Sequence, residues 1–143
     1  MEYLFKGKDK ETNNWIEGSL AHYLDDDSFY IQYQDEYGDD IGSMVHKGTV
    51  CQYTGLKDFN LNEEKAEKIF SGDILQHKWQ FGEDRGTSYL LVKFDDGAFR
   101  LFEEENQPYS SELLDRETIE CCNLKKVGNI FDNPELMKLN KNN

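Results

Sequence analysis

Apolar and polar residues alternate with a period of two along much of this chain, a pattern typical of β-strands with one buried face. The alternation runs from Trp15 to Tyr23 and resumes from Phe29 to Gln34. Between these stretches stand Asp25-Asp26-Asp27 and Ser28, which are residue types that favour turns. The sequence therefore predicts an antiparallel hairpin closed by an acidic turn.

A second hairpin is predicted between Tyr89 and Phe102, where two alternating stretches flank Asp96-Gly97. This dipeptide favours a two-residue type I′ turn, which requires a positive φ at both positions. That turn fixes four cross-strand pairs: Leu91 with Phe102, Val92 with Leu101, Lys93 with Arg100, and Phe94 with Phe99. The lysine and the arginine are like charges in opposition, which costs roughly a few tenths of a kcal/mol. We expect neighbouring acids, such as Asp95 or those at 103–105, to offset this cost.

Shorter apolar stretches indicate further strands, which we place around Met44-Val45 and over Thr49–Thr54, Ile74–Trp79 and Val127–Phe131. Helix signals are few. Asn62 is a suitable cap for a short helix near 62–70, because acidic residues follow it in the first turn. Asn133-Pro134 predicts the start of a short C-terminal helix, with Asn as the cap.

No internal repeat or linker-like composition divides the chain, so we predict a single domain over residues 1–143. Many short strands with two short helices indicate a mainly β fold, either a small barrel or two packed sheets. With 9 Phe and 8 Tyr in the chain, we expect aromatic side chains to line the interior.

Acidic residues outnumber basic ones, 29 to 16 in 143 residues, which gives a net charge of −13. Binding to a nucleic-acid backbone or an anionic membrane requires clustered cations, so neither partner is expected. The negative charge favours solubility, with recognition of a basic protein as the alternative. Residues 1–10 lack the pattern of a secretory signal, and no apolar stretch reaches the roughly 18 residues of a membrane span. We therefore expect a cytoplasmic protein.

Few side chains indicate reaction chemistry. Cys51, Cys121 and Cys122 lack metal-ligand spacing and are expected to be free thiols. His22 and His46 stand apart from carboxylates at any diagnostic spacing, and His77 is predicted to lie at the edge of a core. The acidic clusters do not fit a calcium-binding loop. We therefore predict no catalytic, cofactor-binding or metal-ligating residues.

Three segments together resemble the YopX family of bacteriophage and prophage proteins. They are Gln52–Asp58 (QYTGLKD), Ile69–Ile74 (IFSGDI) and Val127–Leu136 (VGNIFDNPEL), so the strongest match spans about residues 51–137. The resemblance implies a small SH3-like β-barrel with extra N-terminal strands, a phage or prophage origin and a bacterial host cytoplasm. It implies no catalytic residues, because the family has no established activity. An acidic stretch at 61–68 departs from the family pattern.

Three residues of these motifs also have a structural interpretation. Gly55 and Gly72 are predicted to adopt a positive φ or to allow close backbone approach. Asp73 is predicted to accept backbone N–H bonds that hold the turn before the next strand.

The function expected from these features is that of an uncharacterised accessory protein without enzymatic activity. We expect it to bind a host or phage protein, or another copy of itself through open sheet edges. The alternative is an acidic inhibitor that imitates DNA and binds a basic host protein. An enzyme is the third hypothesis, and it requires a histidine or Cys121 to meet a carboxylate in the folded chain.

Overall fold

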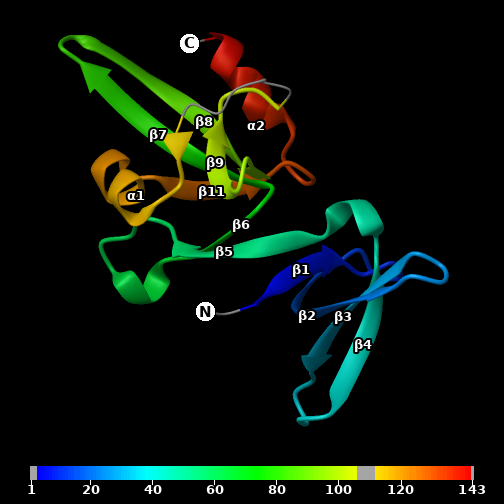
Figure 1. Ribbon diagram of the computed structural model, residues 1–143. Coiled ribbons are helices and arrows are strands. Elements are labelled where there is room, and N and C mark those ends of the chain that lie inside the picture. Colours follow the sequence, from blue (N-terminus) through cyan, green and yellow to red (C-terminus); the bar gives the residue numbers. More distant parts are fainter. Residues whose placement is uncertain (1–2, 106–111, 143) are drawn as a thin grey trace. The chain divides into compact units, whose positions relative to one another are not determined.

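The computed structural model describes residues 3–105 and 112–142 and divides the chain into two compact units, residues 1–53 and 54–143 (Figure 1). Antiparallel strands dominate both units, which confirms the predicted mainly β class. Among the described residues the strand pairings form open sheets, so the SH3-like barrel stays a prediction. That the chain forms one domain also stays a prediction.

The first unit is a single antiparallel sheet with strand order β4-β3-β2-β1-β5. Its elements are β1 (Phe5–Lys8), β2 (Trp15–Tyr23), β3 (Ser28–Gln34), β4 (Asp40–Val45), a 3₁₀-helix (Lys47–Thr49) and the start of β5 (Cys51–Lys57). β2 and β3 form the predicted hairpin, with Leu20 opposite Ile31 and Asp27 in the turn at a φ of 54°. Ile31 and Val45 are the most deeply buried side chains of this unit.

The second unit contains a sheet with strand order β10-β9-β8-β7-β11, and its strand β6 lies beside β5. Its elements are a 3₁₀-helix (Glu63–Lys65), β6 (Lys68–Phe70), β7 (Asp73–Phe81), β8 (Asp84–Asp95), β9 (Ala98–Phe102), β10 (Glu112–Leu113), α1 (Arg116–Cys122), β11 (Lys125–Asn129), α2 (Glu135–Lys138) and a 3₁₀-helix (Leu139–Asn142). None of the helices in the described chain is long and apolar enough to cross a bilayer.

Two apolar clusters bury the two faces of this sheet. One contains Ile69, Leu75, Leu90, Val92, Leu101, Leu114, Ile119 and Leu124, and so includes α1 and β6. The other contains Ile74, Leu91, Phe102 and Met137, and so includes α2. Because successive strand residues point to opposite faces, Leu90 and Leu91 belong to different clusters, and the apolar run in β8 is buried throughout.

The expectation of a Phe- and Tyr-lined interior is confirmed only in part. Most buried side chains are aliphatic, and Phe70, Phe102 and Tyr53 are the aromatic ones among the buried described residues. Alternation explains the difference, because it places many aromatic rings on solvent-facing positions of strands and turns. Phe81 at the end of β7 is 83% exposed.

The second predicted hairpin is confirmed in its register. β8 and β9 place Phe94 opposite Phe99 and Lys93 opposite Arg100, and Asp96 and Gly97 have φ values of 48° and 78°. The Phe94 and Phe99 rings meet edge to face at 5.2 Å. Backbone carbonyls accept from the two cations: Lys93 Nζ donates to Glu105 O at 2.8 Å and Arg100 Nε to Asp95 O at 3.0 Å.

The helix predicted near 62–70 is a single 3₁₀ turn, Glu63–Lys65. Asn62 does cap it, since its side chain accepts from Glu64 N–H at 3.2 Å. The remaining residues are extended, because Ile69 and Phe70 are buried in β6, where Thr54 Oγ1 donates to Ile69 O at 2.8 Å. Burial in the sheet therefore outweighs the local helix signal.

Two boundaries near the C-terminus also differ from expectation. The strand predicted over Val127–Phe131 is β11 (Lys125–Asn129), with an irregular register at Val127. The predicted terminal helix is present as α2, but Asn133 Oδ1 accepts from Asn129 N–H at 3.2 Å instead of capping it.

Candidate functional site

A buried carboxylate holds a surface loop in the second unit. Asp58 is 5% exposed, and its Oδ1 accepts from Glu67 N–H at 2.8 Å while its Oδ2 accepts from Lys126 N–H at 2.9 Å. Asp58 N–H in turn donates to Glu67 O at 2.8 Å. One side chain therefore closes the base of the segment from 58 to 67 and fixes it to β11.

Local hydrogen bonds shape the tip of this loop. Asn60 Oδ1 accepts from Asn62 N–H at 2.9 Å, and Asn62 caps the following 3₁₀ turn. Phe59 N–H donates to Leu124 O at 2.8 Å, and the Phe59 ring packs against the larger apolar cluster. Leu61 is 93% exposed. The Leu61 side chain therefore faces solvent, while hydrogen bonds hold the loop backbone before and after this residue.

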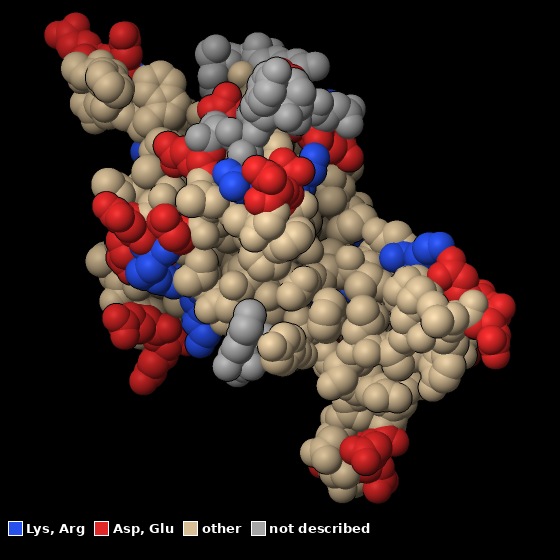
Figure 2. All heavy atoms as spheres, in the orientation of Figure 1, with Lys and Arg blue, Asp and Glu red and all other residues tan. Residues whose placement is uncertain are grey.

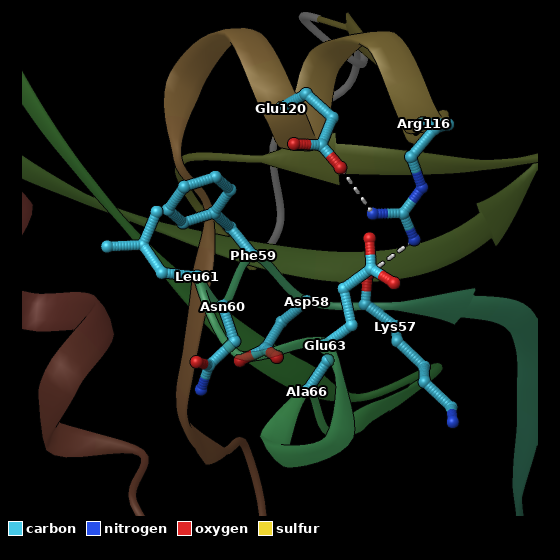
Figure 3. A pocket seen from close by; sticks show the side chains of 9 residues that line it. All are labelled: Lys57, Asp58, Phe59, Asn60, Leu61, Glu63, Ala66, Arg116 and Glu120. Atoms are coloured by element: carbon cyan, nitrogen blue, oxygen red, sulfur yellow. Dashed lines mark hydrogen bonds and ion pairs between the residues drawn. The ribbon is translucent and has the colours of Figure 1, made fainter.

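A first cavity of about 520 Å³ lies between this loop and α1 (Figure 3). Arg116 spans it, with Nη2 donating to Lys57 O at 2.8 Å and Nη1 lying 3.2 Å from Glu120 Oε1. Carboxylates of Asp58 and Glu63 also contribute to the lining. Positively and negatively charged side chains therefore lie close together in this cavity.

A second cavity of about 300 Å³ shares part of its lining with the first. It is lined by Phe59, Asn60, Leu61, Gln76, Lys78, Cys122, Asn123 and Lys125. Phe59, Asn60 and Leu61 line both cavities and form what we call the shared wall. The second lining holds two lysines, three side-chain amides and no carboxylate.

A third cavity of about 510 Å³ belongs to the first unit and is lined by Tyr23, Asp25, Asp26, Ser28 and Tyr30. The two tyrosine rings meet edge to face at 5.2 Å. The Ser28 hydroxyl donates to Asp26 Oδ1 at 2.6 Å and lowers the pKa of this carboxyl, so Asp26 is ionised at neutral pH. This cavity combines aromatic surface with negative charge.

The acidic excess is not confined to that cavity. On the face drawn in Figure 2, acidic side chains form several separate groups with uncharged surface between them. Among the described residues, no three His, Cys, Asp or Glu side chains lie close enough to hold a metal ion.

The fold gives His22 a partner that its sequence spacing did not suggest. Its Nε2 lies 2.7 Å from Asp27 Oδ1 across the hairpin turn, and its ring stacks on Phe29 with centroids 4.0 Å apart. Lys47 Nζ contacts the other oxygen of Asp27. Hydrogen bonds from Lys47 and His22 lower the pKa of Asp27. His46 Nε2 lies 3.0 Å from Asn13 Oδ1, and His77 is half-buried, as predicted.

The three cysteines are free, as predicted, with Cys51 buried, Cys122 half-buried and Cys121 exposed. Burial raises the pKa of the Cys122 thiol, and electrostatic interactions with Glu112 and Cys121 raise it further. Cys122 is therefore a neutral, largely apolar group at physiological pH.

Helix α1, which supplies Arg116, Glu120 and Cys122 to the cavities, is absent from the expected elements. The sequence signals for this helix are the residues at its two ends. Asp115 accepts from Thr118 N–H at 2.7 Å as the N-cap, and Asn123 ends the helix with a φ of 50°. Asp and Asn are residue types that favour these two helix ends, and their spacing in the sequence fits a helix of this length.

Comparison with known proteins identifies a family for this chain. The profile of the YopX protein family matches residues 4–138. This chain belongs to the YopX family. The match confirms the resemblance noted in three segments and extends it to both compact units of the YopX chain.

A solved structure shares the fold of this YopX protein. It is the crystal structure of protein EF1440 from Enterococcus faecalis, which aligns over 96% of this chain and 99% of its own, with a TM-score of 0.56 and 19% sequence identity.

Part of the chain is also similar to two curated enzyme subunits. Phosphoribosylformylglycinamidine synthase subunit PurL from Rhodopseudomonas palustris is 35% identical in strain HaA2 and 34% in strain BisB5, in each case over 71 residues. These matches involve 42% of this chain, and the chain spans 10% of the length of these curated relatives.

The motif residues of this YopX protein have structural roles. Gly55 and Gly72 have φ values of 85° and 89°, as predicted, and so adopt a conformation that glycine tolerates best. Asp73 Oδ2 accepts from Phe70 N–H at 2.7 Å, which confirms the predicted side-chain bond across the turn. The acidic stretch at 61–68, by contrast, contributes Leu61 to the shared wall.

Proposed function

We propose that this YopX protein is a non-catalytic accessory protein that binds a protein partner at the shared wall. The observation that supports this function is the 93% exposure of Leu61 on a loop whose base is closed by a buried carboxylate. An exposed leucine gains roughly 1.5–3 kcal/mol when it is fully buried. A contact surface whose backbone is already ordered loses little conformational entropy on binding.

The proposal includes the wider setting that the family resemblance implies. The chain is of phage or prophage origin and acts in a bacterial host cytoplasm, and its second unit forms a partly open, SH3-like barrel. Packing of Ile69 from β6 with Leu75, Leu90 and Leu101 supports this architecture, because β6 then helps to enclose the same core as the longer sheet.

The test is capture of a partner with matched leucine variants. Tagged wild-type chain, Leu61→Ser and Leu24→Ser are each incubated with a bacterial lysate, and bound proteins are quantified by mass spectrometry. Leu24 is 83% exposed in the first unit, so its substitution removes a similar apolar surface elsewhere. Leu61→Ser should lose the partner and Leu24→Ser should retain it. Equal retention by both variants contradicts the proposal.

The third cavity favours a second candidate, an acidic inhibitor of a basic protein. Tyr23 and Tyr30 present aromatic surface beside Asp25 and Asp26, a combination that accepts a lysine or arginine side chain through ion pairing and cation–π contact. On this hypothesis, capture of a basic protein weakens steeply with added salt. It should also be lost in Asp25→Asn/Asp26→Asn and be unaffected in Leu61→Ser.

A further inference from the structure

Two lysines of the second cavity lie on one face of the sheet. Lys125 of β11 is opposite Gln76 of β7, and Lys78 follows Gln76 by two residues on the same strand. Since side chains two residues apart share a face, Lys78 and Lys125 are diagonal neighbours. Both are exposed, and neither forms an ion pair or a side-chain hydrogen bond within the described part of the chain.

This arrangement contrasts with the rest of the chain. Acidic residues outnumber basic ones by 29 to 16, yet the lining of the second cavity contains two cations and no carboxylate. Like charges on neighbouring strand positions are unfavourable, so the fold gains nothing from placing these two together. A ligand carboxylate between them would relieve their repulsion and accept charge-assisted hydrogen bonds from both.

The other side of the cavity is apolar. Phe59 is half-buried against the core, Leu61 projects into solvent, and the Cys122 thiol is neutral. The amides of Asn60, Gln76 and Asn123 complete the lining and can bond to a peptide backbone. A volume of about 300 Å³ is at the lower limit of ligand pockets, which suits one apolar side chain with an adjoining carboxylate.

We infer that the second cavity binds an acidic peptide segment of the protein partner, with an apolar side chain seated against the shared wall. One or two carboxylates of the segment bind Lys78 and Lys125, while the apolar side chain contacts Phe59, Leu61 and Cys122. The inference rests on the proposed function and specifies its partner. A peptide segment fits this site better than nucleic acid, because the lining combines an apolar side and three amides with only two cations, whereas a nucleic-acid backbone is bound through a longer run of cations.

The test uses fluorescent peptides with the full chain. The probe is a fluorescein-labelled peptide Glu-Leu-Glu-Asp-Phe-Glu-Asp-Leu, and its two controls replace every acid by the matching amide or every apolar residue by Ser. Anisotropy titration should show saturable binding of the probe and at least about tenfold weaker binding of either control, since a charged and an apolar contact are each lost. A labelled oligodeoxythymidine serves as the nucleic-acid probe.

Matched lysine variants locate the site. Lys78→Gln/Lys125→Gln should weaken probe binding at least about tenfold, because both interfacial cations are lost. Lys10→Gln/Lys138→Gln removes the same charge from exposed positions elsewhere and should leave binding unchanged. Circular dichroism and urea unfolding verify that all four substitutions leave the fold intact. Equal weakening in both double variants, no saturable binding of the probe, or tighter binding of the oligonucleotide overturns the inference.

The same variants separate this inference from the proposed function. If Leu61→Ser loses the partner in lysate capture and Lys78→Gln/Lys125→Gln retains it, the protein-binding function stands and the acidic-peptide inference fails. If Leu61→Ser itself retains the partner, the proposed function fails. Loss of the partner in both variants, with Lys10→Gln/Lys138→Gln unaffected, supports the two together.

Discussion

The Nζ atom of Lys126 lies 3.1 Å from Oδ2 of Asp73, whose side chain has no exposed surface. The same ammonium group donates to Lys68 O at 3.2 Å and lies 5.7 Å from the centre of the Phe70 ring. Asp73 also accepts from Phe70 N–H. One ion pair and its neighbouring bonds therefore join β6, which follows the loop with the candidate site, to β7 and β11.

Breaking this pair from the lysine side should destabilise the protein strongly. Lys126→Met leaves a buried carboxylate without its cation, which typically costs about 3–5 kcal/mol of unfolding free energy. Urea unfolding followed by circular dichroism measures the loss. Adding Asp73→Asn to this variant should recover part of the stability, because the uncompensated charge is removed. A loss within about 0.5 kcal/mol, the range of ordinary surface changes, would show that the pair contributes little.

Asp58 is expected to hold the loop that carries Leu61. In Asp58→Asn the side-chain amide has one acceptor oxygen, which bonds to only one of the two backbone N–H groups. Its NH₂ group faces the other N–H, so one of the two buried hydrogen bonds is lost. Leaving a buried donor unsatisfied costs about 1–3 kcal/mol. Hydrogen exchange should be faster at whichever of the Glu67 and Lys126 amides faces the new NH₂ group. Asp39→Asn, an exposed control, should leave both amides protected.

Local signals in the sequence predicted the β8–β9 hairpin correctly down to its residue pairs. Asp96 and Gly97 prefer positive φ, and the turn they form determines the register without help from distant residues. The pairing of Phe94 with Phe99 follows from that turn alone. The same reasoning explains the success at Gly55, where a positive φ is a local requirement.

Elements that depend on tertiary contacts were harder to predict. Helix α1 buries Ile119 alone among its seven residues, so its apolar periodicity is too weak to recognise without its caps. The segment 62–70 has a genuine helix cap at Asn62, but β6 gains more by pairing and burial. Local propensity therefore predicted where the 3₁₀ turn begins, but it predicted a longer helix than the three residues observed.

Sequence patterns could not predict the candidate site either. Lys78 and Lys125 come from strands that are far apart in the chain, and they become neighbours only when β11 adds to the edge of β7. The hydrogen bond from Arg116 to Lys57 O also joins residues that are distant in the chain. Net charge describes only an overall acidic excess, whereas the fold places two cations on one side of the shared wall.

Gly18 should be intolerant of even a methyl group. A Cβ at this position would lie 2.1 Å from Gln32 O, a backbone atom of the paired strand, so the strands would have to separate. Gly18→Ala should therefore lower the unfolding free energy by about 1–3 kcal/mol, the usual cost of overpacking. Gly48→Ala is the matched control, because a Cβ there meets no atom within 4 Å. Thermal or urea unfolding of the two variants provides the comparison, and equal stabilities would contradict the close approach of β2 and β3.

The cap of α1 should make stability depend on pH in a specific window. The N–H and hydroxyl groups of Thr118 lower the pKa of Asp115 from its ordinary value of 3.8, because both stabilise the ionised carboxylate. A group whose pKa is lower in the folded state stabilises the protein fully above its unfolded pKa and loses this contribution as pH falls through the folded value. Asp115→Asn should therefore lower the urea midpoint of unfolding at pH 7, and the difference from wild type should shrink as the pH falls below 3.8. Glu117→Gln, a charge change in the first turn of the same helix that leaves the Asp115 cap in place, controls for the loss of one negative charge. A difference between wild type and Asp115→Asn that stays constant from pH 7 to strongly acidic pH would show that the ionised carboxylate is not the source of the stabilisation.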